Sequence, residues 1–189
     1  MKSKPYKFLL FAFLLFYYGC VHNVIVDNYI PEPVQSNSII AITEFEDQVT
    51  RRTNSMFSMS FPQKPGAQFS DVLTSSLLRA NRFRIIERNQ IAKILREQQL
   101  QLTGLMNEGN YEKIGKLLGA DYIIIGSITD AWWGSDVITH QSSITGSFRI
   151  VSVSTGSTLS SGTFSKRKFT SDLNKTIREV TDDIVLKLK

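Results

Sequence analysis

Residues 120–130 read Ala-Asp-Tyr-Ile-Ile-Ile-Gly-Ser-Ile-Thr-Asp, and this run restricts the fold more than any other stretch of the chain. Its three consecutive isoleucines would point to both faces of an extended strand, because successive side chains alternate between the faces. A strand that is apolar on both faces needs cover on both sides, as in the middle of a sheet with helices packed against it. The run therefore predicts a central strand in a layered α/β fold.

The rest of the chain supplies the elements that such a strand needs. Apolar residues spaced three and four apart predict helices over 67–81, from an N-cap at Asn89 to Leu102, from Asn110 to a closing Gly119, and over 171–189. Runs of β-branched and apolar residues predict strands over 38–45, 82–88, 120–130, 143–154 and 158–168. The order β-α-β-α-α-β-β-β-α predicts a single α/β domain with a mixed sheet of about five strands.

Two connections carry further information. Residues 46–66 form a long polar stretch that contains Arg51 and Arg52, and loops of this length in compact domains are usually functional or disordered. Ser154-Thr-Gly-Ser157 reads as a tight turn, and a Thr-Gly pair between two alternating segments indicates a hairpin.

The N-terminus has the form of an export signal. Three lysines precede an apolar run that ends at Gly19, and the chain's one cysteine, Cys20, follows directly. This resembles a bacterial lipobox, in which the cysteine receives lipid and becomes the first residue of the mature protein. We therefore expect a signal peptide over 1–19, a lipidated tether over 20–37 and a folded domain over 38–189. A plain secretory signal and an uncleaved anchor are the alternative interpretations.

The charge of the chain gives little sign of a nucleic-acid partner. The net charge is +5, but residues 1–19 contain three lysines and no acidic residue, so the mature chain is near +2. No dense basic patch with interleaved aromatic residues is present, which argues against nucleic-acid binding. The short basic run over 165–168 is interpreted as a solvated strand end.

Catalytic patterns are hard to find in this sequence. His22 and His140 have no partner at the spacing of metal ligands, and no phosphate-binding glycine loop is present. The carboxylate group Glu44, Glu46 and Asp47 could form an acid-base pair or a cation site, but solvated charges at a strand end are the favoured interpretation. We predict no enzyme activity, no catalytic residues, no metal and no cofactor.

Two adjacent tryptophans, Trp132 and Trp133, follow the central strand. Neighbouring residues of a strand point to opposite faces, so one core is not expected to hold both side chains. One of them is a candidate for a partner surface or a membrane interface. The alternative is one tryptophan in the core and one packed beneath a loop.

Four motifs resemble one known family in the same order along the chain. They are a segment before the first helix, a strand that ends in Glu-Arg, the Ala-Asp-Tyr strand and a Ser-Thr-Gly hairpin, at residues 57–63, 82–88, 120–128 and 150–161. Each motif alone is unspecific. Together, behind a lipobox-like cysteine, they resemble the curli production assembly/transport family, CsgG.

The resemblance implies an outer-membrane-associated lipoprotein on the periplasmic side. Pore-forming members assemble as rings, cross the membrane with two long β-hairpins and narrow the channel with a loop after the first strand. Here the hairpin positions fall between Ala131 and Ser143 and after Ser161, where the chain is too short to cross. This predicts a short form without the transmembrane hairpins.

The positions of the family's channel-narrowing loop fall on Arg52, Met56 and Phe57, and only Phe57 matches the family. Together with Arg51, these residues are candidates for a loop or interface.

Two non-enzymatic roles follow from the resemblance. The first is a component of a curli-like secretion or envelope-assembly complex, anchored in the outer membrane through lipid, in contact with other envelope proteins and able to form a homo-oligomeric ring. The alternative is an LpoB-like tethered activator of a peptidoglycan synthase. The segment 21–37 spans at most roughly 55–60 Å when extended, which favours the membrane-proximal assembly role.

Overall fold

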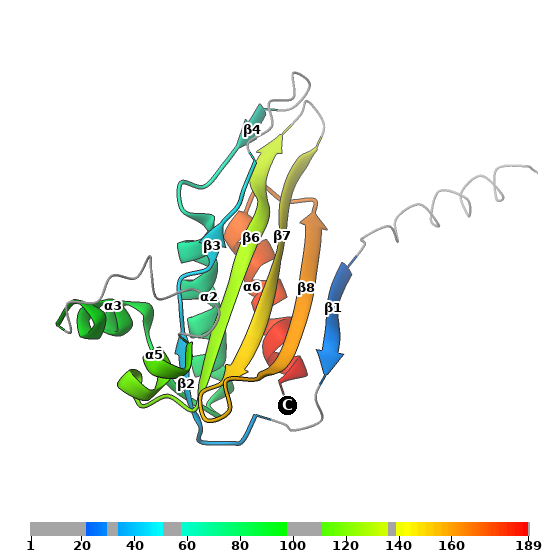
Figure 1. Cartoon of the computed structure of the whole chain (residues 1–189). Coiled ribbons are helices and arrows are strands. Elements are labelled where there is room, and N and C mark those ends of the chain that lie inside the picture. The colour runs from blue at the N-terminus through cyan, green and yellow to red at the C-terminus, as the bar shows by residue number, and fades with distance from the viewer. Residues whose placement is uncertain (1–21, 30–33, 51–57, 98–110, 136–138, 189) are drawn as a thin grey trace, which may run out of the picture.

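The computed structural model describes residues 22–29, 34–50, 58–97, 111–135 and 139–188. Within these ranges the strands are β1 (His22–Tyr29), β2 (Ile39–Ile42), β3 (Glu46–Asp47), β4 (Ser58–Ser60), β5 (Arg84–Ile86), β6 (Tyr122–Ser135), β7 (His140–Ser152) and β8 (Thr158–Lys168). The helices in the described ranges are α2 (Pro65–Ala80), α3 (Arg88–Glu97), α5 (Tyr111–Leu118) and α6 (Leu173–Lys187). Figure 1 shows their arrangement.

The strands form one mixed sheet in the order β1-β8-β7-β6-β2-β5, and β3 and β4 also pair with β6. The strand β6 is antiparallel to β7 along its whole length and parallel to β2 at its first three residues, 122–124. The predicted central run is thus the centre of the sheet, which confirms the single α/β domain. The predicted element order is also confirmed, with β1, β3 and β4 added to it.

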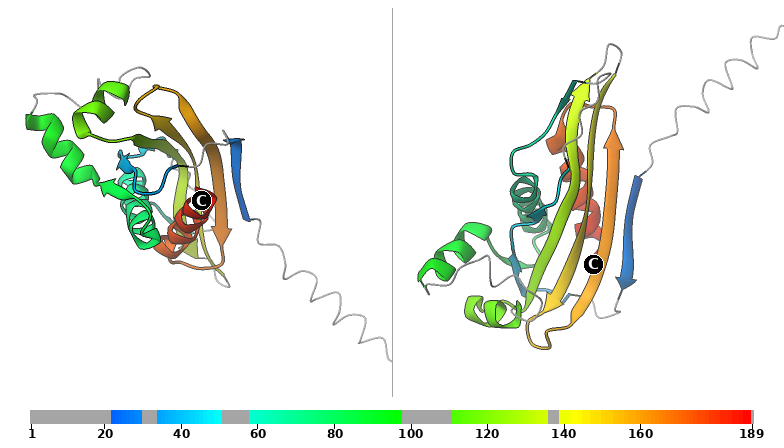
Figure 2. Two further views of the ribbon diagram at one scale, coloured as in Figure 1. Left: turned by 90° about the horizontal axis from the view of Figure 1, so that it is seen from below. Right: turned by 45° about the horizontal axis from the view of Figure 1, so that its top comes forward.

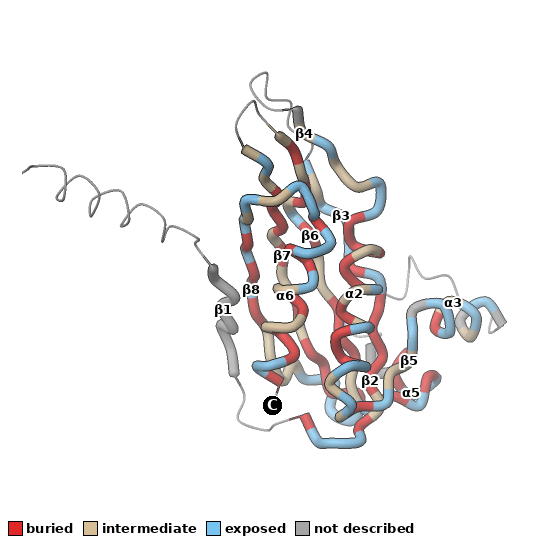
Figure 3. Tube along the Cα trace, turned by 180° about the vertical axis from the view of Figure 1, so that it is seen from behind, coloured by how far each residue is buried: buried red, intermediate tan, exposed pale blue. Residues whose placement is uncertain are grey.

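Helices cover both faces of this sheet (Figures 1 and 2). On one face α2 and α6 lie side by side (Figure 3) and bury the larger core, which includes Ile124 of β6 and Phe148 of β7. Three phenylalanine rings contact one another in this core: Phe69 and Phe164 are stacked with ring centroids 4.7 Å apart, and Phe45 lies at a tilt to Phe69 with centroids 4.8 Å apart. These contacts join α2 to β8 and to the segment between β2 and β3.

A smaller core lies on the opposite face, at the end of the sheet where β6 begins. Ile123 and Ile125 of β6 pack there with Ile91 of α3 and Ile114 of α5. The consecutive isoleucines of β6 therefore serve two cores, one on each face, as expected for a strand covered by helices on both sides. Figure 3 shows the burial along these elements.

The helix ends follow the local sequence. Asn81 ends α2 in the left-handed conformation with φ 50°, and Gly119 ends α5 with φ 64°. Asp172 caps α6 by accepting a hydrogen bond from the backbone N–H of Lys175 at 3.1 Å. The predicted turn between β7 and β8 is confirmed, and Gly156 adopts φ 67° there.

The structure differs from the expectations in two segments. Residues 22–29 of the expected tether form β1, which pairs with the edge of β8; the segment is rich in β-branched residues, which favour a strand. In the connection 46–66, expected to be irregular, residues 46–47 and 58–60 form β3 and β4 because the long strand β6 offers them backbone partners. These additions raise the expected five strands to eight among the described residues.

Candidate interaction surface

The predicted carboxylate group does not converge on one point. Glu44 and Glu46 are exposed, and the Oε2 atom of Glu46 accepts a hydrogen bond from the side chain of Gln48 at 3.0 Å. Asp47 instead accepts a hydrogen bond at 2.5 Å from the backbone N–H of Gly66, in the first turn of α2. The Asp47 carboxylate is therefore part of the scaffold. Across the part of the chain that the structure describes, no group of three His, Cys, Asp or Glu side chains could hold a metal ion.

Most of the site residues predicted from sequence lie outside the described residues. They are the lipidation candidate Cys20 and the loop candidates Arg51, Arg52, Met56 and Phe57. The other two, Trp132 and Trp133, lie near the end of β6, where β4 and β7 flank this strand on its two sides. This end of the sheet extends beyond α2 and α6 (Figure 1).

Trp132 lies on the side of the sheet that faces away from α2 and α6. Its side chain is 6% exposed, and its indole N–H donates a hydrogen bond to the carboxylate of Asp130 at 3.1 Å. The same Asp130 oxygen accepts a hydrogen bond from the hydroxyl of Ser143 at 3.2 Å. The guanidinium of Arg167, from β8, lies 5.6 Å from the centre of the Trp132 ring. We call these four residues the Trp132 cluster; it ties β6, β7 and β8 together.

Trp133 points to the other face and packs, half-buried, against the larger core. The prediction that the two tryptophans point to opposite faces is therefore confirmed. Neither side chain is exposed, so each has a packing role in the single chain. Their predicted part in a partner surface stays a prediction.

A polar face extends from the Trp132 cluster along β6, β7 and β8. The hydroxyls of Ser127 and Ser147 are 3.2 Å apart, and those of Thr145 and Ser165 are 3.1 Å apart. No helix covers this part of the sheet in the described residues (Figures 1 and 2). A sheet face that carries hydroxyl groups satisfied by their neighbours is stable in water and also offers a flat surface for another protein.

The interpretation of the basic run 165–168 as a solvated strand end is wrong for Lys166. Its side chain is 10% exposed and forms an ion pair with Glu179 of α6 at 2.7 Å. Lys168 contacts the other oxygen of Glu179. Lys166 and Lys168 lie on the helix-facing side because they follow the core residue Phe164 by two and four positions, and such residues of a strand share one face. This spacing was the sequence signal that could have revealed the burial.

The pKa of Glu179 reflects this environment. Partial burial raises the pKa of its carboxyl group, but the hydrogen bonds and the charges of Lys166 and Lys168 together outweigh that effect and lower it below the ordinary value. Glu179 is therefore held as a carboxylate, and α6 is joined to β8 by a charged contact as well as by the core.

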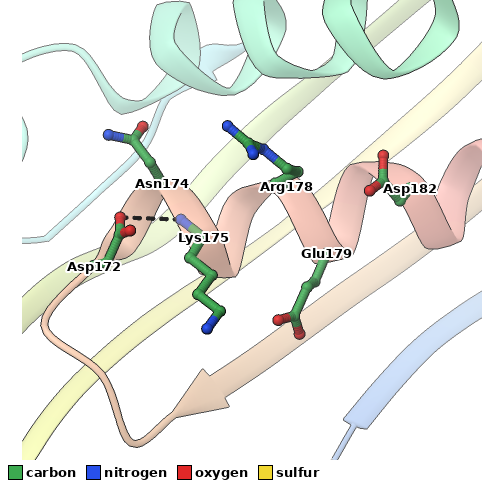
Figure 4. A pocket seen from close by; sticks show the side chains of 6 residues that line it. All are labelled: Asp172, Asn174, Lys175, Arg178, Glu179 and Asp182. Atoms are coloured by element: carbon green, nitrogen blue, oxygen red, sulfur yellow. Dashed lines mark hydrogen bonds between the residues drawn. The ribbon is translucent and has the colours of Figure 1, made fainter. Parts of the chain in front are cut away.

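A shallow, open pocket runs along the outer side of α6, lined by Asp172, Asn174, Lys175, Arg178, Glu179 and Asp182. Figure 4 shows that the side chains diverge: Asn174, Arg178 and Asp182 point toward α2, whereas Lys175 and Glu179 point toward β8. Asp182 forms an ion pair with Arg79 of α2 at 2.7 Å. Charges of both signs that point apart and bind neighbouring elements do not make a converging ligand site, so we assign these residues to packing of the helix layer.

Among the described residues, none of the helices combines the length and the apolar character that a membrane span requires.

This arrangement defines the class of protein: a single α/β domain built on one mixed sheet, with helices on both faces and a partly uncovered polar sheet face. The chain belongs to the family of the curli production assembly/transport component CsgG, whose model matches residues 24–131, more than half of its length. The match runs from β1 into β6. No sequence among the curated proteins matches the chain.

The chain is a short form of this family, as predicted. Ser135 at the end of β6 pairs with His140 at the start of β7, so residues 136–139 make the whole connection at the first hairpin position. At the second, β8 ends at Lys168 and α6 begins at Leu173. Neither connection has the length of two strands that cross a membrane.

Solved structures share the fold over a larger part of the chain than the family model matches. The PelC dodecamer from Paraburkholderia phytofirmans has 13% identity and a TM-score of 0.58, covering 89% of this chain and 97% of that one. The lipoprotein GNA1162 from Neisseria meningitidis has 13% identity and a TM-score of 0.56, covering 79% and 96%. The LpoB C-terminal domain from Salmonella enterica has 16% identity and a TM-score of 0.50, covering 71% and 85%. At these identities the similarity establishes the fold.

Proposed function

We propose that this protein is a non-enzymatic lipoprotein at the periplasmic face of the outer membrane and a component of a curli-like secretion or envelope-assembly complex. The observation that carries the proposal is the match of residues 24–131 to the family of a curli production assembly/transport component. The signal-like segment 1–19 and Cys20 supply the route of export and the lipid anchor. The protein then acts through contacts with other envelope proteins.

We further propose that several copies form a ring. A structure with the same fold over 89% of this chain is described as a dodecamer, and this supports the ring. The uncovered polar face of β6, β7 and β8 offers a flat surface for a neighbouring copy. Its hydroxyl groups are already hydrogen-bonded within the sheet, so burying them against another copy would cost little.

The first test is the mass of the mature protein extracted from membranes in mild detergent, measured denatured and then native. The denatured mass should equal that of a chain beginning at Cys20 with added acyl groups. The native mass should be a multiple that corresponds to one discrete ring. An unmodified chain would exclude the lipoprotein, and a monomer would exclude the ring.

A second test concerns the loop candidates Arg51 and Arg52. Reversing both charges, in the variant R51E/R52E, should impair secretion or assembly while leaving the free energy of unfolding unchanged. The matched control is Arg96→Glu on α3, an exposed arginine on a different part of the surface. Equal effects of the two variants on secretion would contradict a role for the loop.

The alternative is an LpoB-like tethered activator of a peptidoglycan synthase. The similarity of the fold to the LpoB C-terminal domain over 71% of this chain favours it as the second candidate. This role requires a monomer with a partner-facing patch, and loss of the protein should weaken the cell wall. The native mass separates the two candidates directly.

A further inference from the structure

The end of β8 combines an exposed aromatic ring with basic side chains. Phe169 follows the last residue of β8 and is 72% exposed, whereas Phe45, Phe69, Phe148 and Phe164 are almost fully buried. Arg167 is exposed, and Lys166 and Lys168 share the single carboxylate of Glu179. This group of side chains therefore keeps a net positive charge beside an exposed ring.

The register of β1 places the start of the folded domain next to this group. The strands β1 and β8 are antiparallel, and His22 pairs with Lys166. Only Val21 separates His22 from Cys20, and two residues of chain span at most about 7 Å. A lipid on Cys20 must therefore enter the membrane close to the end of β8. Phe169 lies three residues after Lys166, directly after the end of β8.

We propose that the turn after β8 contacts the lipid surface, with the Phe169 ring in the interfacial region and Arg167 beside the phosphates of anionic lipids. The proposal rests on the lipid anchor of the proposed function. An aromatic ring is suited to the boundary between headgroups and acyl chains, and basic side chains are attracted to an anionic surface. Together with the anchor, this contact would set the orientation of the domain, since one lipid attachment alone leaves a domain free to rotate.

The structure provides a matched control position. Leu186, near the other end of α6, is 56% exposed and is separated from the first turn of α6 by about 20 Å of helix. The lipidated full-length protein has no free thiol once Cys20 is acylated, because Cys20 is the one cysteine of the chain. The variants Phe169→Cys and Leu186→Cys would therefore each carry one reactive thiol at an exposed position.

The test labels each variant with an environment-sensitive fluorophore and reconstitutes it into vesicles of phosphatidylethanolamine and phosphatidylglycerol, with and without lipid-attached quenchers. The label at 169 should shift its emission to shorter wavelength and lose intensity with the quenchers, while the label at 186 should do neither. If the lipid quenchers leave the label at 169 unchanged on protein whose acyl mass is confirmed, the membrane contact is excluded. The lipid anchor of the proposed function would still stand. A mass without acyl groups overturns the anchor and this proposal together.

Discussion

The carboxylate of Asp47 accepts a hydrogen bond from the backbone N–H of Gly66 across 2.5 Å and so connects β3 to the first turn of α2. The N-cap residue of α2 is Lys64, which provides no side-chain hydrogen bond, and the first turn contains no acidic residue. A carboxylate distant in sequence therefore accepts a hydrogen bond from one N–H group of the first turn and lies at the positive end of the helix dipole.

Removing this contact should destabilise the domain. We expect Asp47→Ala to lower the free energy of unfolding by about 1 kcal/mol, the usual cost of losing a helix N-cap, and Asp47→Asn to cost less because it keeps an acceptor. Urea-induced unfolding measures the difference. The neighbouring exposed Glu46→Ala should stay within about 0.5 kcal/mol of the parent. Equal losses at the two positions would contradict the assigned role of Asp47.

The close approach of Phe45 to β6 depends on Gly126. A Cβ atom at position 126 would overlap the Phe45 ring and the backbone carbonyl of Ser147. Gly126→Ala should therefore cost roughly 1–3 kcal/mol, the range for overpacking a core. In a double-mutant cycle with Phe45→Leu the two losses should be less than additive, because the smaller side chain relieves part of the overlap. Full additivity in thermal or urea unfolding would contradict this account.

A buried hydroxyl pair joins β7 to α6: the Oγ atom of Ser142 lies 2.7 Å from the Oγ1 atom of Thr176. Both residues are fully buried. Thr176→Val should cost about 1–3 kcal/mol, because it leaves the Ser142 hydroxyl without this partner. The double variant S142A/T176V should recover most of that loss, since no polar group is then left alone. A double variant less stable than T176V would contradict the claim that T176V destabilises the protein by leaving the Ser142 hydroxyl without its partner.

The ion pairs of Glu179 predict a specific pH dependence. Because the folded state lowers the pKa of Glu179, its contribution to stability is present above the pKa of the unfolded chain and is lost as the pH falls through the lower folded-state value. Glu179→Gln should thus destabilise the protein at neutral pH by roughly 1–3 kcal/mol, since buried Lys166 loses its carboxylate partner.

The measurement is the free energy of unfolding of the parent and of Glu179→Gln from neutral to acidic pH. The difference between them should shrink as the pH falls below about 4.5, the ordinary value for a glutamate. The exposed Glu87→Gln, at the end of β5, serves as the control for a carboxylate outside this ion-pair group. A difference that grows toward acidic pH would contradict the sign of the effect.

Short-range sequence patterns predicted the helices, strands and turns that are defined by neighbouring residues. The apolar run 120–130, the amphipathic segments of α2 and α6 and the turn at 154–157 were recognisable because each satisfies a rule within a few neighbouring residues. The strands β3 and β4 were not recognisable, since two or three residues are too few to show an alternating pattern of apolar side chains. They become strands only because β6 provides backbone partners.

The site was less predictable for a related reason. The burial of Lys166 depends on Glu179, which follows it on the next element, and the helix-capping role of Asp47 depends on Gly66, nineteen positions away. Such contacts are decided by the tertiary arrangement, which periodicity does not report. The opposite directions of Trp132 and Trp133 were predictable from strand geometry alone, whereas their burial depends on what packs over them.

The position of β6 has a consequence for how the chain acquires its structure. Its partners β2, β3 and β4 precede it by up to 82 residues, and β7 and β8 follow it. The amino-terminal half therefore has no central strand to pair with until β6 is available, and its parallel contacts close a long loop. Such non-local pairing slows folding. For the exported lipoprotein that we propose, this delay would keep the polypeptide extended while it crosses the inner membrane.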